Sequence, residues 1–212
     1  MAKKKEEVIE LVQPRLKKLK VKNFRCIGDK TVEIELDDIV ILVGPNNTGK
    51  SSIIRAYEVV MSHGSAAGKL ALEDFPKGRI DPEKYPTIEL VTVVGDNSPG
   101  ADWIHTNEKG EMEVRERWFW EDAGNPIRQG WNVNTKDWDE KVPWGAPNVA
   151  KSRRPEPHHV SAFDSPEKQS KEITSILITA LMDRIKSLAE ESKDEAKETP
   201  YKKLLEAVKT IQ

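Results

Sequence analysis

The first half of the chain alternates apolar and polar residues over short stretches that are typical of β-strands. In residues 19–24 apolar side chains alternate with lysines, which is the period of a half-exposed strand. Residues 31–36 alternate in the same way, and a turn over residues 25–30 joins the two stretches, so we expect a hairpin. The lysines suit either an exposed edge strand protected by charge or a contact with DNA. Residues 39–43, Ile-Val-Ile-Leu-Val, form a continuous apolar run that predicts a third, buried strand.

Apolar residues then recur at helical spacing before strand-like patterns return. Residues 51–61 predict a helix with one apolar side, and Gly64 is its expected stop. Residues 64–86 are polar and contain glycines and prolines, which predicts a loop or a short helix. Residues 87–94 predict a further strand. All six tryptophans lie between residues 103 and 144, where strand-like stretches joined by glycine-containing turns predict an antiparallel meander.

The longest strand predicted in this meander has two faces of different character. One face carries Met112, Val114, Trp118 and Trp120, and the other carries Arg115, Arg117 and Phe119. Arginines between aromatic rings are compatible with stacking on nucleic acid bases. Indole rings packed beside solvated cations give the same pattern, so both interpretations stay open here.

Helices are expected in the last part of the chain. Residues 143–157 are rich in proline and include a basic stretch, which suits a loop or a contact with a phosphate backbone. Ser165 is a good N-cap with proline at the next position, and Thr199 precedes a second amphipathic helix. The segment 164–212 is therefore expected to serve as a surface for a partner protein or to pack on the sheet, and to continue into a further region.

One motif carries chemistry. The eight residues from Gly44 to Ser51 fit the phosphate-binding pattern G-x-x-x-x-G-K-[ST] between a predicted strand and a predicted helix. Its backbone amides can converge on phosphate oxygens, Lys50 can reach the β- and γ-phosphates, and the Ser51 hydroxyl can bind Mg²⁺. The alternative is a glycine-rich turn that matches by chance. The expected nucleotide-binding residues are Gly44, Pro45, Asn46, Asn47, Thr48, Gly49, Lys50, Ser51 and Ser52, with ATP and Mg²⁺ as cofactors.

Composition narrows the class of protein. The chain has 212 residues, of which 37% are hydrophobic and 33% charged, enough for one domain with a modest core and long polar insertions. Its net charge of −2 gives no global field for nucleic acid. The single cysteine, Cys26, excludes an internal disulfide and a cysteine-based zinc site. No apolar run reaches membrane-spanning length and residues 1–14 form a charged leader, so we expect a cytoplasmic protein with no membrane contact.

Three quoted stretches together carry a family resemblance. They are Leu19-Lys-Val-Lys-Asn-Phe-Arg-Cys-Ile27, Val32-Glu-Ile-Glu-Leu36 and Ile41-Leu-Val-Gly-Pro-Asn-Asn-Thr-Gly-Lys-Ser-Ser52. In this order they resemble the start of ABC-class ATPases of the RecF and SMC type, and most closely the overcoming-lysogenization-defect (OLD) family. The resemblance is specific over residues 16–62 and weak afterwards.

The resemblance implies a fold and further site residues. It implies an α/β P-loop NTPase fold, with an ABC-type first lobe, a mixed central sheet, an antiparallel β subdomain and C-terminal helices. The lobe would span residues 15–163, with the antiparallel insertion at about 87–133. In that family the arginine of the Asn-Phe-Arg motif approaches the phosphates, which gives this role to Arg25. Gln129 is the candidate for the glutamine that senses Mg²⁺ and the γ-phosphate.

The same resemblance implies a function and leaves two alternatives. The implied function is ATP binding in DNA repair or anti-phage defence, with ATP-driven dimerisation of two ATPase heads and contact with DNA. The chain has no recognisable signature loop and no strand ending in Asp-Glu, so we expect ATP hydrolysis to need further parts. One alternative is a self-contained kinase or GTPase-like enzyme with Asp96 as its metal-binding carboxylate. The other is an interaction module that does not hydrolyse nucleotide, and in which bound nucleotide only stabilises the fold.

Overall fold

The computed structural model describes residues 14–96, 98–146 and 165–191. The chain divides into two compact units, residues 1–157 and 158–212, which are described separately below. Three predictions lie outside the described residues: the charged leader up to residue 13, the basic stretch within 143–157, and the helix expected after Thr199.

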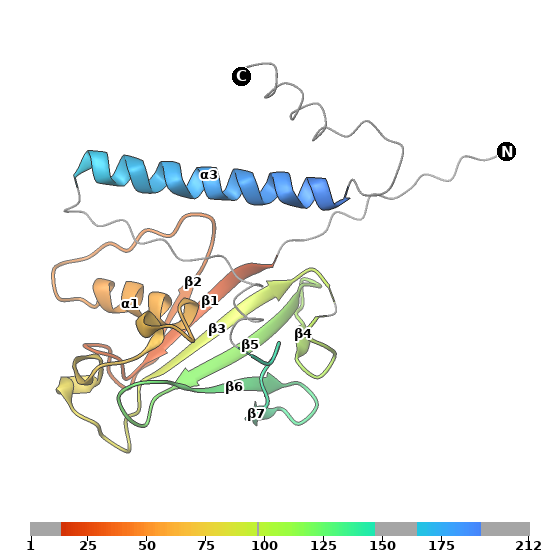
Figure 1. Ribbon diagram of the computed structural model, residues 1–212. Helices are drawn as coiled ribbons and strands as arrows, with labels where there is room; N and C mark the ends of the chain where they lie inside the picture. Colours follow the sequence, from red (N-terminus) through yellow and green to blue (C-terminus); the bar gives the residue numbers. More distant parts are fainter. Residues whose placement is uncertain (1–13, 97, 147–164, 192–212) are drawn as a thin grey trace. The chain divides into compact units, whose positions relative to one another are not determined.

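The first unit is built on one antiparallel sheet (Figure 1). Its strands follow the order β2-β1-β3-β5-β6-β7, and β4 pairs with β5 beside this path. The bounds are β1 Arg15–Lys22, β2 Val32–Glu35, β3 Thr87–Val94, β4 Ile104–Thr106, β5 Met112–Phe119, β6 Ile127–Asn132 and β7 Asp137–Asp139. The predicted hairpin, the strand at 87–94 and the antiparallel meander are therefore confirmed.

The prediction that residues 19–24 form an edge strand is wrong. β1 lies inside the sheet, because β2 pairs with it on one side and β3 on the other. Its lysine side chains line the sheet face away from the core, where Lys18 and Lys20 both form ion pairs with Glu33 on β2. The alternating lysines mark a solvated face of an interior strand, a pattern that an edge strand shares.

Helix α1, Lys50–Met61, covers the other face of the sheet (Figure 1). It ends close to the predicted stop, since Gly64 takes a positive φ of 88° three residues after Met61. The shared core contains Leu19, Val21, Phe24, Ile27, Ile53, Ala56, Val59, Val60, Met61, Leu70, Phe75, Ile88, Leu90, Trp118 and Trp120. This core fixes the start of α1 against the end of β1 and the turn that follows it.

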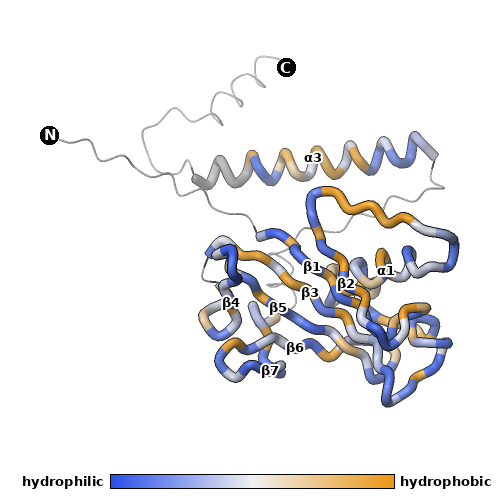
Figure 2. The backbone as a smooth tube through the Cα atoms, turned by 180° about the vertical axis from the view of Figure 1, so that it is seen from behind, coloured by the Kyte–Doolittle hydropathy of each residue, from blue (hydrophilic) through white to orange (hydrophobic). Residues whose placement is uncertain are grey.

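The apolar run at 39–43 is not a strand, contrary to the prediction. Ile39, Ile41 and Val43 are 80%, 77% and 87% exposed, whereas Leu42 packs partly against the core. A strand needs hydrogen bonds from a neighbouring strand, and none of the described strands pairs with this segment. Figure 2 shows it as an apolar loop between β2 and α1.

The α/β fold class of a P-loop NTPase is confirmed, with one difference in detail. Every strand pairing among the described residues is antiparallel, so the parallel part of the expected mixed sheet is not among them. Residues 64–86 form the predicted loop with short helical turns, η1 Ala66–Gly68, η2 Leu72–Asp74 and η3 Pro76–Gly78.

In the second unit the structure describes helix α3, Pro166–Glu191. Ser165 caps it as predicted, since its hydroxyl accepts a hydrogen bond from the amide of Lys168 at 3.3 Å. Five of its apolar side chains are about half exposed or more, namely Ile173, Leu177, Ile178, Leu181 and Met182. Within the described ranges, no helix combines the length and the apolar character needed to cross a bilayer.

Candidate functional site

The phosphate-binding motif forms an exposed loop that ends at the N-terminus of α1. Gly49 is the N-cap of α1 and has a left-handed φ of 94°, a conformation that side chains disfavour. Its carbonyl accepts the hydrogen bond from the amide of Ile53 at 3.0 Å, which begins the helix. No side chain caps α1 and its first turn has no acidic residue, so its free amides face no competing anion among the described residues. This arrangement suits phosphate.

The Lys50 ammonium group lies over the loop. Its Nζ donates hydrogen bonds to the carbonyl of Gly44 at 2.8 Å and to that of Pro45 at 2.5 Å. Thr48 donates its hydroxyl proton to the same Pro45 carbonyl at 2.9 Å, which keeps the loop curled. A positive charge held at a loop that leads into a helix N-terminus suits the binding of a polyphosphate.

The turn between β1 and β2 packs against this loop. Cys26 places its Sγ 3.2 Å from the hydroxyl oxygen of Ser52, and that serine is only 5% exposed. Gly49 lies so near that a Cβ at this position would sit 3.4 Å from the Cys26 sulfur. Ser52 therefore faces the turn with its side chain and can offer a phosphate only its amide. Ser51 is exposed beside it, as a Mg²⁺-binding hydroxyl requires.

Arg25 lies in the same turn and is held by Asp74. The Arg25 Nε donates to Asp74 Oδ1 at 2.7 Å, and the Arg25 amide donates to the Asp74 carbonyl at 2.9 Å. The Asp74 side chain is 2% exposed, whereas that of Arg25 is 31% exposed. Arg25 is thus fixed in the turn next to Cys26, which contacts Ser52, and its side chain stays partly exposed.

Two other sequence candidates lie away from this site. Gln129 is on β6, on the sheet face opposite α1, and its Oε1 accepts a 3.0 Å hydrogen bond from Arg117 Nε. That position is at odds with a role beside Ser51, because the sheet lies between them. Asp96 follows β3, whose end lies opposite the start of β1, roughly 25 Å along the sheet from the turn that carries Cys26. A metal site that joins Asp96 to the phosphate loop is therefore excluded by the strand register.

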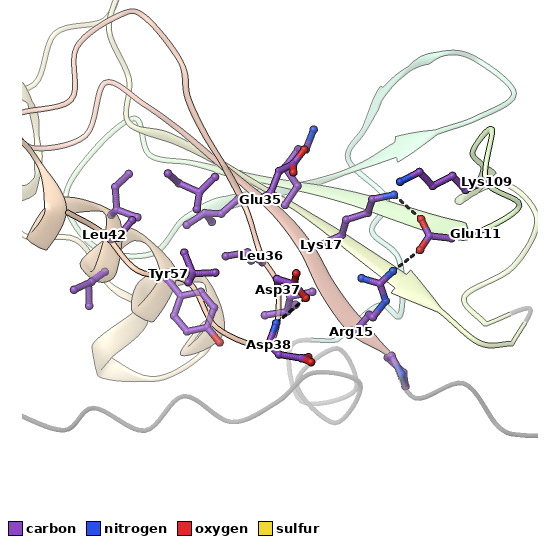
Figure 3. A pocket seen from close by; sticks show the side chains of 18 residues that line it. Arg15, Lys17, Glu35, Leu36, Asp37, Asp38, Leu42, Tyr57, Lys109 and Glu111 are labelled. Atoms are coloured by element: carbon purple, nitrogen blue, oxygen red, sulfur yellow. Dashed lines mark hydrogen bonds and ion pairs between the residues drawn. The ribbon is translucent and has the colours of Figure 1, made fainter. Parts of the chain in front are cut away.

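The structure also has a hollow of about 970 Å³ that is not the phosphate loop (Figure 3). Its apolar floor includes Leu36, Leu42 and Tyr57, and burial raises the pKa of the Tyr57 hydroxyl. One rim is ionic, since Lys17 donates to both Glu111 and Glu113 at 2.6 Å. These residues join β1 to the start of β5.

The carboxylates of this rim are stabilised in their charged forms. Hydrogen bonds from Lys17, and then from Asn107, lower the pKa of Glu111 to about 2. The same contacts with Glu111 and Glu113 raise the pKa of Lys17. Because the charged groups of the rim are paired with one another, the rim provides little free charge for a phosphate group. We therefore interpret it as structural.

The sheet face away from α1 carries Arg115 and Arg117, which the sequence placed on one face of the strand, and they lie against tryptophans of the neighbouring strands β6 and β7. The Arg117 guanidinium lies 4.3 Å from the ring centre of Trp138, and that of Arg115 lies 4.7 Å from Trp131. Arg115 also lies 3.6 Å from a carboxylate oxygen of Glu89. Burial lowers the pKa of Arg117, which is partly covered by its neighbours. Arg115, Arg117, Trp131 and Trp138 are all partly exposed, so this arginine–tryptophan face is compatible with both interpretations.

The comparisons with known proteins agree with the geometry of the loop and turn. Residues 15–117 match the AAA ATPase domain family. Over 46 residues the chain is 46% identical to the OLD nuclease of Thermus scotoductus, a match that covers 22% of this chain and 8% of that protein. These matches support the resemblance of residues 15–117 to a RecF/SMC/OLD-like ABC-class ATPase region.

A solved structure from work on the ATP-driven dimerization and DNA-stimulated activation of SMC ATPases resembles the chain at a lower sequence identity. It shares 19% sequence identity with the chain, with a TM-score of 0.41, over 76% of this chain and 98% of the other. A likeness of this size assigns no function. The chain also spans only a small part of the OLD nuclease that it matches.

Sequence reasoning missed the buried carboxylate of Asp74. Asp74 lies in the stretch 64–86, which reads as a polar loop, and its partner Arg25 is 49 residues away in the sequence. The only local signal was the apolar Phe75 directly after it, which is 1% exposed. An acidic residue beside a buried aromatic in a loop is a weak sign of a buried ion pair.

Proposed function

We propose that this region binds Mg²⁺·ATP through the loop 44–51 as one half of an ABC-class ATPase site. The observation that supports the proposal best is the position of Lys50. Its ammonium group lies over the curled loop at the start of α1, where no side chain caps the helix. In the proposal Lys50 and the amides of residues 46–51 hold the phosphates, and the Ser51 hydroxyl holds the metal ion. Mg²⁺, when bound, would offset the charge of the β- and γ-phosphates.

The biological role in this proposal is ATP-dependent work in DNA repair or anti-phage defence. ATP would join two heads, each supplying what the other lacks, and the exposed apolar side of α3 would take part in binding a partner protein. This part of the proposal is supported by the resemblance to RecF, SMC and OLD proteins. The position of Asp96 argues against the self-contained kinase or GTPase-like alternative.

The alkylation rate of Cys26 tests nucleotide binding at this loop. Cys26 is the single cysteine, it is exposed, and its sulfur lies 3.2 Å from Ser52 Oγ. At an ATP concentration of about ten times Kd, with Mg²⁺ present, we expect a maleimide to react about tenfold more slowly, because mainly the free fraction reacts. The rate is followed by intact-protein mass spectrometry.

The control for this labelling experiment is Lys50→Ala, in which the same ATP concentration is expected to protect Cys26 little. Equal alkylation rates with and without Mg²⁺·ATP in the unmodified protein would argue against binding at the loop. Protection that persists fully in Lys50→Ala would place the nucleotide elsewhere.

The contact with DNA in this proposal is assigned to the arginine–tryptophan face. Replacing Arg115 and Arg117 together by glutamine is expected to weaken binding of a fluorescent oligonucleotide by about tenfold at low salt, because each arginine contact adds electrostatic attraction. Fluorescence anisotropy measures the change. Arg79→Gln, at an exposed loop position, is the matched control. Unchanged affinity in the double variant would remove this face from the proposal.

A further inference from the structure

We propose that Asp74 is the positioning residue for Arg25, and that it holds the guanidinium group beside the phosphate loop. This inference rests on the proposed function, in which the loop binds ATP. It assigns a role to a carboxylate that lies outside the phosphate-binding motif and 49 residues from its partner.

The Asp74 carboxylate is buried and each of its oxygens has partners. Oδ1 accepts the 2.7 Å hydrogen bond from Arg25 Nε, and Oδ2 accepts a 3.1 Å hydrogen bond from the amide of Ala71. Its side chain is only 2% exposed. A buried carboxylate without a cationic partner is costly, so the pair with Arg25 is expected to be well defined rather than transient.

The contact leaves the outer end of the guanidinium group available. Asp74 contacts Nε, the guanidinium nitrogen that is attached to the aliphatic part of the side chain. In the part of the chain that the structure describes, no acceptor lies within hydrogen-bonding distance of the two terminal nitrogens of Arg25. An arginine held in this way can present two parallel N–H groups to a phosphate.

Asp74 also connects this arginine to the helix that begins at the loop. Arg55 of α1 places its Nη2 3.9 Å from Asp74 Oδ2, and it donates to the carbonyls of Ala67 at 3.1 Å and Lys69 at 3.2 Å. The same carboxylate therefore contacts the turn that carries Arg25 and the helix that carries Lys50. Asp74 therefore links the turn that positions Arg25 to the helix that positions Lys50.

Because Asp74 is negatively charged, the direction in which its removal changes the affinity for ATP tests the inference. A carboxylate near an anion site repels the ligand, so simple removal of its charge should tighten ATP binding. If instead Asp74 positions Arg25, the removal should weaken ATP binding, because the guanidinium group is no longer held toward the phosphates. Asp74→Asn keeps the shape and separates these two outcomes.

The experiment measures the Kd of Mg²⁺·ATP by isothermal titration calorimetry for the full chain and four variants. We expect Asp74→Asn to weaken binding roughly tenfold and Arg25→Ala by ten- to a hundredfold, the range for charged hydrogen bonds. Adding Asp74→Asn to Arg25→Ala is expected to change nothing further. Arg55→Gln is the control for stability, since it removes the other guanidinium group from Asp74 and leaves Arg25 in place.

Circular dichroism melting curves show whether each variant is folded. If Asp74→Asn does not fold, Arg25→Lys replaces it, because one ammonium group cannot bind Asp74 and a phosphate in the same way as the planar fork. A Kd close to that of the unmodified chain in Arg25→Lys would overturn the inference.

The remaining outcomes separate the inference from the function it rests on. Failure of the unmodified chain to bind ATP in a Lys50-dependent manner would overturn the proposed function. Tighter or unchanged binding in Asp74→Asn, in a chain that does bind ATP, would overturn the positioning role alone. So would an equal loss on adding Asp74→Asn to Arg25→Ala, because Asp74 would then act without Arg25.

Discussion

Replacing Lys50 by alanine is expected to weaken the binding of Mg²⁺·ATP by a hundredfold or more. In the structure its ammonium group lies over the loop, 2.8 Å from the Gly44 carbonyl oxygen and 2.5 Å from that of Pro45. Hydrogen bonds to charged groups contribute about 1.5–3 kcal/mol each, and Lys50 is proposed to bind two phosphates. The variant also loses the bonds that keep the loop curled, so part of the loss is expected to come from a less ordered loop.

The measurement is a calorimetric titration of ATP into both proteins. Lys141→Ala is the matched control, because Lys141 is an exposed lysine outside the loop and its turn. An affinity of Lys50→Ala within about threefold of the unmodified protein would contradict the proposed site, since a direct charged contact is worth more than that.

ATP turnover, assayed in the same preparations, tests whether the site is one half of a larger one. We expect the chain to bind ATP without repeated turnover, because the positioning groups of the loop are present and the sequence has no recognisable strand ending in Asp-Glu to activate water. Repeated turnover by the chain alone, lost in Lys50→Ala, would favour a self-contained enzyme.

The largest effect on folding is expected from Arg128→Ala. Its guanidinium group is 6% exposed and pairs with the 1% exposed carboxylate of Glu116 on the core side of the sheet. It also donates to the carbonyls of Pro143 and Gly145, both at 2.8 Å. Burial lowers the pKa of Arg128 to about 10, which still leaves it charged at neutral pH.

The alanine variant would leave the Glu116 charge buried without its cation, so we expect the free energy of unfolding to fall by about 3–5 kcal/mol. Urea unfolding followed by tryptophan fluorescence measures the change. Arg115→Ala is the matched control: its ion pair with Glu89 is on the exposed face, and it is expected to cost about 1 kcal/mol or less. A loss for Arg128→Ala no larger than for Arg115→Ala would show that the buried pair is not needed.

Local patterns predicted those elements whose residues carry their own signal. The strand at 87–94 and the helix after the phosphate loop were recognisable because the apolar period and the glycine pattern lie within a few residues. The position of β1 was not, because an interior strand with one solvated face has the same alternation as an edge strand.

Interactions between distant residues were beyond the reach of the sequence. Arg25 and Asp74 are 49 positions apart, and nothing in either neighbourhood specifies the other. Glu116 and Arg128 are 12 positions apart on neighbouring strands, and only the strand register shows that they share the core face. The run at 39–43 failed for a related reason, because its apolar residues predict burial without saying which strand would pair with it.

That run has a consequence for how self-association of the chain is interpreted. An unpaired loop with Ile39, Ile41 and Val43 exposed offers apolar side chains and backbone groups on which a second copy can associate. Such dimers would form without nucleotide, would persist at high salt and would include Lys50→Ala. Dimers joined by ATP would require Lys50 and disappear when Mg²⁺ is chelated. Light scattering with and without EDTA therefore distinguishes dimers formed through this apolar loop from dimers that require bound nucleotide.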